Sequence, residues 1–278
     1  MISPYFEQKN FILYQGDAIE LLNQFESKKF DLIYVDPPYF LSNDGITCKS
    51  GKMVSVNKGG WDRSKGFKQD VEFIDSWIKA CRRVLKENGS IWVSGTLHNI
   101  YKVGYLLEKN DYDIINDIVM FKPNAPPNLS CKYFTHSHEV VLWARKSRNS
   151  QHTFNYEEMK LWNNPKDKLK NKDKQMRSVW SIPLIPKEEK EFGKHPTQKP
   201  LELLNRIISS SSNEGDWVLD PFVGSGTTGI ACSILNRKFI GIDLNKEYLD
   251  IAIKRFKHKE KEGLLFSPES KNHLMKFI

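Results

Sequence analysis

Cysteine is scarce in this sequence, and the few cysteines are not paired. The four present among 278 residues are Cys48, Cys81, Cys131 and Cys232, and no two of them form a C-x-x-C pair. This spacing excludes a disulfide framework and a four-cysteine zinc site, both of which need cysteine at short intervals. We therefore expect a protein of the reducing cytoplasm.

The chain also lacks long apolar segments. No run approaches the roughly 20 apolar residues that a membrane-spanning helix needs, and residues 1–17 lack the basic start and apolar core of a secretory signal. Acidic residues are outnumbered, with 34 Asp and Glu against 42 Lys and Arg, a formal charge of +8 and a pI of about 9.1. We expect no membrane contact, and the basic balance favours a polyanionic partner.

What the sequence does contain is a regular alternation of short apolar runs with stretches of helical periodicity. The strands expected from it cover residues 11–14, 32–35, 90–94, 114–121, 139–144, 217–219 and 239–242. The helices expected cover residues 18–25, 71–85 with a stop at Asn88–Gly89, 99–109, 200–209, 227–235 and a last helix from 246. The sequence therefore predicts an α/β fold.

The periodicity fails between residues 145 and 194. Within this segment, residues 160–177 hold seven Lys or Arg against two Asp and few apolar residues. Such a composition is not expected in the core of a sheet. We therefore expect one catalytic and cofactor-binding α/β domain, made of residues 1–144 and 195–278, that is interrupted by an insert over residues 145–194.

A glycine-rich turn follows the expected strand 217–219, in the sequence Asp220-Pro-Phe-Val-Gly-Ser-Gly-Thr-Thr-Gly229. Gly224 and Gly226 allow a tight turn and a close approach of the backbone to a ligand. The helix that follows offers free N–H groups, and Asp243, at the end of the next strand, can accept both hydroxyls of a ribose. These features fit a dinucleotide or S-adenosylmethionine, and a purely structural turn is the alternative.

A second motif, Asp36-Pro37-Pro38-Tyr39, stands at the end of the expected strand 32–35. An exocyclic amine such as adenine N6 is a poor nucleophile because its lone pair is delocalised into the ring. The Asp36 carboxylate and the Pro37 carbonyl can each accept one N–H, which favours a tetrahedral nitrogen, and the prolines hold both acceptors rigidly. Tyr39 can stack on the base. A dehydrogenase has no use for this motif, whereas a plain proline turn would look the same.

The two motifs and two further elements resemble the β-class amino-group DNA methyltransferases, in particular those specific for adenine N6. One further element is His195-Pro-Thr-Gln-Lys-Pro200, which in that family lies beside the methionine part of the cofactor. The other is Gly16-Asp17, whose Asp contacts the cofactor adenine in the family. The resemblance covers nearly the whole chain. It implies a Rossmann-like, S-adenosylmethionine-dependent methyltransferase sheet that is circularly permuted and carries an inserted DNA-recognition region.

The resemblance also assigns the site residues. The catalytic residues it implies are Asp36, Pro37, Pro38 and Tyr39. The residues it implies for binding S-adenosyl-L-methionine are Asp17, Thr197, Lys199, Asp220, Phe222, Gly224, Ser225, Gly226, Thr227 and Asp243.

Basic side chains in three segments are candidates for contacts with DNA phosphates. The segments are a glycine-rich flap over residues 43–66, the stretch after residue 121, which resembles the family's segment near the target base, and the insert. The candidates are Lys49, Lys52, Lys58, Arg63, Lys122, Lys168, Lys170, Lys172 and Lys174. An ordinary solvated surface is the alternative for the flap and the insert, and a proline-rich strand exit is the alternative for the stretch after residue 121.

Two other chemistries find little support. Cys131, His136 and His138 lack a fourth partner at zinc-like spacing, so no metal site is expected. No cysteine follows a proline, so the nucleophile of cytosine-C5 methyltransferases is absent.

The sequence therefore predicts a site-specific DNA adenine-N6 methyltransferase of a type II restriction–modification system, acting on an adenine rotated out of the duplex. Asp at the first position of D-P-P-Y favours adenine in this family, and the chain resembles the second methyltransferase of GATC-specific systems. Cytosine N4, RNA and protein amino groups remain alternative substrates. A non-catalytic nucleic-acid-binding protein is the alternative of another class, and both a monomer and a homodimer are compatible with the sequence.

Overall fold

The computed structural model describes residues 2–42, 46–49, 52–55, 60–163, 171–185, 187–193 and 195–266. Its strands are β1 (Phe6–Gln8), β2 (Phe11–Gln15), β3 (Phe30–Val35), β4 (Ile46–Lys49), β5 (Lys52–Ser55), β6 (Leu85–Gly95), β7 (Asp113–Phe121), β8 (His138–Arg145), β9 (Val179–Ser181), β10 (Trp217–Asp220) and β11 (Lys238–Asp243). Its α-helices are α1 (Ala18–Gln24), α2 (Phe67–Val84), α3 (Ile100–Lys109), α4 (Tyr156–Leu161), α5 (Leu201–Ser211), α6 (Thr227–Ile234) and α7 (Lys246–Lys261). Every strand and helix expected from the periodicity is present, with shifted ends.

The strands form a mixed sheet in the order β1-β2-β11-β10-β3-β6-β8-β7-β9, and β4 and β5 form a separate hairpin. The five strands β2, β11, β10, β3 and β6 run parallel, so their carboxyl ends share one edge of the sheet. β8 runs antiparallel to β6, with Val140 opposite Gly95. The first residues of β8 therefore lie at the same edge as the carboxyl ends of the parallel strands.

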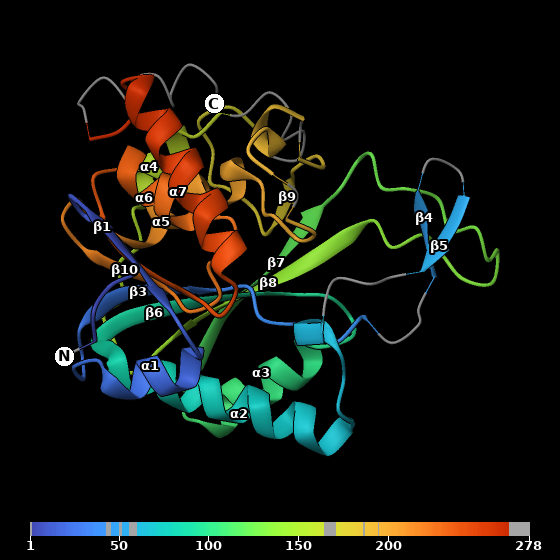
Figure 1. Ribbon diagram of the computed structural model, residues 1–278, viewed down its shortest axis with the longest axis horizontal. Coiled ribbons are helices and arrows are strands. Elements are labelled where there is room, and N and C mark those ends of the chain that lie inside the picture. Colours follow the sequence, from blue (N-terminus) through green and yellow to red (C-terminus); the bar gives the residue numbers. More distant parts are fainter. Residues whose placement is uncertain are drawn as a thin grey trace.

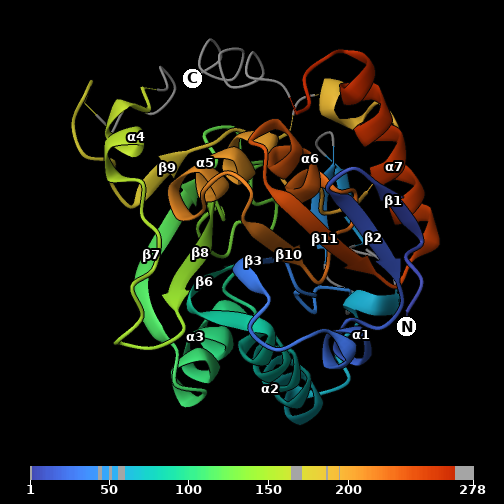
Figure 2. The ribbon, with the colours of Figure 1, turned by 90° about the vertical axis from the view of Figure 1, so that its left-hand side faces the viewer.

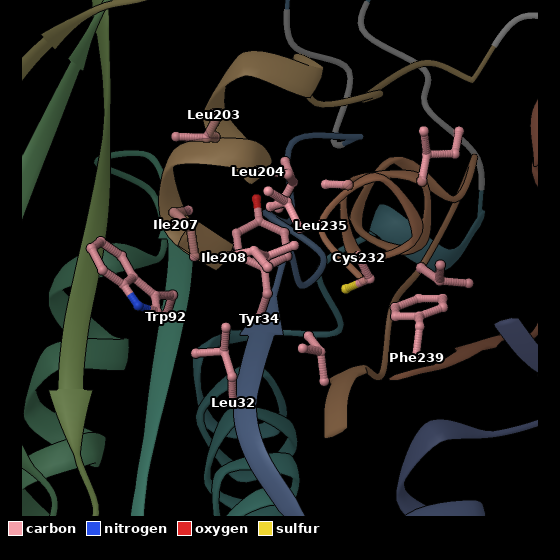
Figure 3. Packing of buried hydrophobic residues seen from close by; sticks show 14 of the residues in the cluster. Leu32, Tyr34, Trp92, Leu203, Leu204, Ile207, Ile208, Cys232, Leu235 and Phe239 are labelled. Atoms are coloured by element: carbon pink, nitrogen blue, oxygen red, sulfur yellow. The ribbon is translucent and has the colours of Figure 1, made fainter. Parts of the chain in front are cut away.

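Helices cover both faces of the sheet. In Figures 1 and 2, α1, α2 and α3 lie on one face, and α4, α5, α6 and α7 lie on the other. Figure 3 shows the core of the second face, where Tyr34 of β3 and Trp92 of β6 lie beside Ile207 and Ile208 of α5. None of the described helices is long and apolar enough to cross a membrane.

The structure corrects the expected end of the long helix after residue 71. The sequence places the stop at Asn88–Gly89, but α2 ends at Val84 because Leu85 pairs with Phe30 as the first residue of β6. Asn88 and Gly89 lie inside β6 instead. A Cβ at Gly89 would lie 2.5 Å from Leu85 Cδ1 and 3.0 Å from the Asp31 carbonyl oxygen, so a larger residue fits there only if Leu85 moves.

Several short elements were not expected. β1 and β9 have three residues each, and the β4–β5 hairpin lies within the glycine-rich flap. Strands this short give too few residues for a period of two to be recognised.

Parts of the 145–194 segment pack against the α/β body. β9 pairs in parallel with β7 and adds the edge strand of the sheet. The Trp162 and Trp180 side chains are buried, and the guanidinium carbon of Arg206 on α5 lies 4.9 Å from the centre of the Trp180 ring. The Asn155 amide also donates to the Ser209 carbonyl at 2.7 Å. A separate recognition region between these anchored ends stays a prediction.

Gly229 on α6 is expected to be required for close helix–sheet packing. A Cβ at this position would lie 2.4 Å from Phe11 Cε2 and 2.5 Å from Phe239 Cε1, so Gly229→Ala overpacks the core. We expect a loss of about 1–3 kcal/mol in the free energy of unfolding. Gly104→Ala on α3 is the control, because its Cβ meets Leu142 at an ordinary 3.5 Å and alanine favours helix over glycine. Urea unfolding measures both, and equal stability of the two variants would contradict this packing.

Candidate active site

The two motifs predicted to act in catalysis and cofactor binding meet at the carboxyl edge of the parallel strands. Asp17 follows β2, Asp243 ends β11, Asp220 ends β10 and Asp36 follows β3. A cavity of about 700 Å³ opens there, within the range of about 300–1,000 Å³ that is usual for small-molecule sites. The sequence-predicted residues that line it are Asp17, Asp36, Pro38, Arg63, Thr197, Phe222, Gly224 and Asp243.

Asp243 organises the wall of the cavity beside the glycine loop. Its carboxylate accepts the Gly224 N–H at 2.9 Å and the Asn245 N–H at 2.8 Å. Gly224 has φ of +50°, and a Cβ there would lie 2.8 Å from His195 Nε2, so no other residue fits without a shift. Burial raises the pKa of Asp243 to about 6, against the effect of these two hydrogen bonds.

Asp220 lies beneath the same loop. Its carboxylate accepts the Phe222 N–H at 3.0 Å and the Thr228 hydroxyl at 2.5 Å. Burial raises its pKa to about 7, and these hydrogen bonds work in the opposite direction. Asp220 therefore shapes the turn and is not among the residues that line the large cavity.

Ser225, Gly226 and Thr227 are also directed toward the protein. The Arg255 guanidinium of α7 donates to the Ser225 carbonyl at 2.7 Å and to the Thr227 hydroxyl at 2.8 Å. Gly226, with φ of +79°, packs on α7, where a Cβ would lie 2.6 Å from Ala252 Cβ. These three residues fix the loop against α7 rather than line the large cavity.

Asp17 and Thr197 lie on the wall of the cavity. Asp17 is the N-cap residue of α1, and its Oδ1 accepts the N–H groups of Ile19 and Glu20 at 2.9 and 3.0 Å. The Thr197 N–H donates to His195 Nδ1 at 3.4 Å, and the His195 ring lies 4.2 Å from the ring centre of Tyr248. The aromatic side chains of Phe40, Phe73 and Tyr248 line the cavity as well, and none of them belongs to a motif recognised in the sequence.

The Asp36 carboxylate has two close partners on the side away from solvent. Asp36 Oδ1 accepts the Tyr39 hydroxyl at 2.7 Å and lies 2.8 Å from the Lys199 ammonium, which in turn donates to the Tyr39 hydroxyl at 2.9 Å. Burial raises the pKa of Asp36 above its ordinary value, and the Lys199 ammonium opposes this rise. Tyr39 is only 5% exposed, which leaves little of its ring available for stacking on a base.

Glu139, the second residue of β8, extends this cluster. Its carboxylate lies 3.4 Å from the Lys199 ammonium and also pairs with the ammonium of Lys122. Burial disfavours the charged form of Glu139, yet the two ammonium groups outweigh it and lower its pKa to about 2. Likewise, burial alone would lower the pKa of Lys199, but Asp36 and Glu139 raise it. Lys199 thus lies behind the D-P-P-Y motif and is not among the residues that line the large cavity.

Asp62 fixes the turn that follows the D-P-P-Y motif. This carboxylate is 1% exposed. Its Oδ1 accepts the N–H groups of Tyr39 and Phe40 at 2.8 and 2.9 Å, and its Oδ2 accepts the Leu41 N–H at 3.1 Å. Phe40 has φ of +60°, a conformation that costs energy in a residue other than glycine. Asp62 holds this strained turn in place.

The candidate DNA-contacting residues fall into three groups: exposed residues, residues paired within the protein, and residues outside the described part of the chain. Arg63 is exposed at the cavity, and Lys172 and Lys174 are exposed on the surface. Lys122 is drawn into the ion pair with Glu139. Lys49 and Lys52 are register partners in the β4–β5 hairpin, and Lys58, Lys168 and Lys170 lie outside the described residues. Within the described part of the chain, no group of three His, Cys, Asp or Glu side chains is placed to hold a metal ion.

A family model described as DNA methylase, which covers N6 and N4 methyltransferases, matches residues 30–254. The chain belongs to this DNA methylase family. It is 51% identical over 265 residues to the type II methyltransferase M2.LlaDCHI of Lactococcus lactis subsp. cremoris, which covers 95% of this chain and 96% of that protein. It is 49% identical over 257 residues to the type II methyltransferase M2.MboI of Moraxella bovis, covering 92% of this chain and 91% of that protein.

Solved structures agree with this assignment. The M1.HpyAVI–SAM complex is 30% identical, with a TM-score of 0.63 over 87% of this methylase and 97% of that chain. The PvuII DNA methyltransferase, described as cytosine-N4-specific, is 20% identical with a TM-score of 0.71, over 92% of this chain and 89% of that chain. The second likeness shows that the two proteins share the mixed α/β fold.

Two carboxylates of this methylase were missed by the sequence analysis, Glu139 and Asp62. The available signal for Glu139 was a single acidic residue at the start of an otherwise apolar strand. That signal points to the site only when the strand is known to run antiparallel to β6. Asp62 gave no such signal, because its partners are backbone N–H groups about 20 residues away in the sequence.

Lys199 is expected to keep Asp36 ionised. Lys199→Met removes the ammonium that lowers the pKa of Asp36, so that pKa rises further. If catalysis needs the carboxylate, activity is lost as the pH falls through this pKa. The acid limb of the kcat/KM profile for DNA methylation therefore moves to higher pH.

Lys199→Arg, which keeps the positive charge, is the control and should restore the acid limb. Removing one partner from a buried ion pair typically costs about 3–5 kcal/mol, so thermal unfolding of each variant is measured alongside. A folded Lys199→Met protein with an unchanged acid limb would rule out this role.

Proposed function

We propose that this methylase transfers the methyl group of S-adenosyl-L-methionine to adenine N6 in DNA, as the modification enzyme of a type II restriction–modification system. The observation that carries the proposal is the placement of Asp36 and the Gly224 loop after adjacent strands, β3 and β10, with both lining one cavity. In-line transfer needs the amine and the methyl group held together in one geometry. Relatives named as type II methyltransferases, 49% to 51% identical over most of the chain, support the biological setting.

The residues around the cavity fit S-adenosyl-L-methionine. An ionised carboxylate has about four acceptor positions, so Asp243 can accept ribose hydroxyls while it keeps its bonds to Gly224 and Asn245. Phe222 and Phe73 give the cavity an apolar wall, and Asp17 supplies a polar group at the start of α1. The relative M1.HpyAVI was solved as a complex with SAM.

The cofactor supplies an electrophilic methyl group on a sulfonium, and this chain's own residues prepare the amine. Among the described residues, the contacts of Asp36 with Tyr39 and Lys199 both go to Oδ1, which leaves Oδ2 as an acceptor for one N6–H. The Pro37 carbonyl accepts the other. These two hydrogen bonds draw the nitrogen toward a tetrahedral form with its lone pair available. Lys199 keeps the carboxylate charged, and Tyr39 fixes its orientation.

The target base and sequence rest on the resemblance. Asp at the first position of the motif supports adenine N6 rather than cytosine N4, and the likeness to second methyltransferases of GATC systems supports that site. The adenine is rotated out of the duplex, since enzymes that modify a base bring it into a pocket, and the Asp36 carboxylate lines such a cavity. Arg63 and the exposed Lys172 and Lys174 contact phosphates, which supply affinity but no sequence information.

We also propose that the strand order is a circular permutation of the usual methyltransferase sheet, with the recognition region in 145–194. The glycine-loop strand β10 is central, with β11 and β2 on one side and β3 on the other. β2, from the amino-terminal part of the chain, pairs in parallel with β11, the last strand of the chain. This pairing joins the amino-terminal and carboxyl-terminal parts of the chain in one sheet. The strands therefore keep the same neighbours even if the chain begins at a different strand.

Asp36 is expected to act in methyl transfer and Asp243 in cofactor binding. Asp36→Ala should abolish methyl transfer while S-adenosylmethionine still binds, because Asp36 acts on the amine. Asp243→Ala should weaken cofactor binding by roughly ten- to a hundred-fold, the usual loss for a hydrogen bond to a charged group. Calorimetric titration with the cofactor and methyl transfer from labelled cofactor separate the two effects. Full transfer activity in Asp36→Ala would overturn the mechanism.

The predicted methylation site is tested with plasmid DNA that lacks adenine methylation. Incubation with the protein and S-adenosylmethionine should protect GATC sites from an endonuclease that methylation blocks and expose them to one that requires it. A single mismatched base pair typically costs about 1–3 kcal/mol in recognition, so near-matching sites should be modified much more slowly. Modified-nucleoside analysis identifies the base. Methyl groups at another sequence would remove the GATC assignment and leave the amine chemistry standing.

A further inference from the structure

The loop between β7 and β8 carries exposed aromatic side chains that have no role in the proposed reaction so far. Residues 122–137 leave the sheet on the side of the molecule where the β4–β5 hairpin lies (Figure 1). Phe134 is 96% exposed, and its neighbour Tyr133 is 60% exposed. Single exposed apolar residues are common on proteins, but two adjacent aromatic rings on a projecting loop indicate a surface that meets a partner.

The loop has a defined shape. The Asn128 amide donates to the Tyr133 carbonyl at 2.6 Å, and the Asn128 N–H donates to the Thr135 hydroxyl at 3.2 Å. The Asn124 side chain accepts the Leu184 N–H at 3.0 Å, which ties the loop to the segment after β9. A loop that is already ordered loses little conformational entropy when it binds.

Both ends of the loop are attached to the catalytic cluster. The Lys122 N–H donates to the Ser137 carbonyl at 2.7 Å and closes the base of the loop. The Lys122 ammonium pairs with Glu139, and Glu139 shares Lys199 with Asp36. The aromatic residues therefore stand on a loop that begins and ends beside the carboxylate proposed to hold the target amine.

The charge of the loop suits a polyanion. From Lys122 to His138 the sequence has two Lys and two His and no Asp or Glu. Tyr133 packs against His136, with ring centres 5.4 Å apart, whereas the ring of Phe134 is almost wholly in solvent. Phe134 is therefore the side chain of this loop that can enter a partner without first leaving another contact.

We propose that Phe134 enters the DNA base stack at the position that the target adenine vacates. This inference rests on the proposed function, since it assumes a base rotated into the cavity. Extrusion of a base costs stacking and pairing energy, and an inserted aromatic ring restores a stacking contact within the duplex. The ring thereby stabilises the extruded state.

The test compares two duplexes that carry one copy of the methylated site. The first is intact, and the second has an abasic position opposite the target adenine, so that pairing no longer opposes extrusion. Phe134→Ala should lower kcat/KM on the intact duplex by roughly ten- to a hundred-fold, the effect expected from loss of one base–aromatic stack. On the abasic duplex the rate should stay near that of the parent. Phe134→Trp should keep the activity on both.

Tyr105→Ala is the control, because Tyr105 is 67% exposed on α3, on the helical layer below the sheet in Figure 1. It should act like the parent on both duplexes. Equal losses on the two duplexes in Phe134→Ala, or no loss on either, would overturn the inference; the loop would then hold the site or bind another protein.

A second measurement keeps this inference separate from the proposed function. With 2-aminopurine in place of the target adenine, fluorescence rises when the base leaves the stack; this base has no 6-amino group to methylate, so methyl transfer is measured separately on the duplex that contains adenine. The parent should give this rise and Phe134→Ala a smaller one. If the fluorescence rise depends on Phe134 but the adenine duplex is not methylated, the proposed function alone is contradicted. If the adenine duplex is methylated equally with and without Phe134, the inference alone is contradicted.

Discussion

The Lys199 ammonium, held between the buried carboxylates of Asp36 and Glu139, is the interaction on which the candidate site depends. Lys122 brings a second ammonium to Glu139, so two negative and two positive charges balance in a region with little access to water. Removing four charges from water is costly, and apolar residues of similar size often give equal or greater stability. The cluster is therefore better explained by what it does for Asp36, whose pKa burial raises and the Lys199 ammonium lowers, than by any gain in folding.

This arrangement depends on the direction of the strands as much as on the residues. The parallel strands bring the ends of β2, β11, β10 and β3 to one edge, and these ends carry the residues of the cofactor loop and the D-P-P-Y motif. The reversal of direction at β8 adds Glu139 to that edge from a strand's first residues rather than its last. Lys199 comes from the segment before α5 and meets carboxylates from two different strands. A sheet with β8 parallel to β6 would carry Glu139 to the opposite edge.

Much of this organisation could be predicted from the sequence, because it is encoded by short-range patterns. Apolar periodicity predicted the strands and helices of the body. The resemblance to the methyltransferase family implied a permuted sheet, and in the structure Asp36 and the Gly224 loop follow the neighbouring strands β3 and β10. The roles within the glycine loop were not predictable in the same way, since Ser225 and Thr227 bond Arg255 on a helix about 30 residues later. Lys122 was expected among the DNA contacts because a lysine shows its charge in the sequence but not its partner. Polar contacts between residues far apart in the sequence leave no periodic pattern in it. Their partners can be assigned only when the fold is known.

The carboxylates around the cavity fall into two kinds that match the two halves of the proposed reaction. On the cofactor side, Asp243 and Asp220 are bonded to backbone N–H groups and a hydroxyl, and burial raises their pKa values to about 6 and about 7. On the base side, Asp36 and Glu139 share ammonium groups, and Glu139 stays charged with a pKa of about 2. Hydrogen bonds from ribose hydroxyls favour the ionised form of a carboxyl group, so we expect cofactor binding to lower the pKa of Asp243. In the proposed reaction, Asp36 must be charged before the base arrives, because it draws the lone pair of the amine out of the aromatic ring. The ammonium groups of Lys199 and Lys122 balance the negative charges of Asp36 and Glu139 before any base is bound.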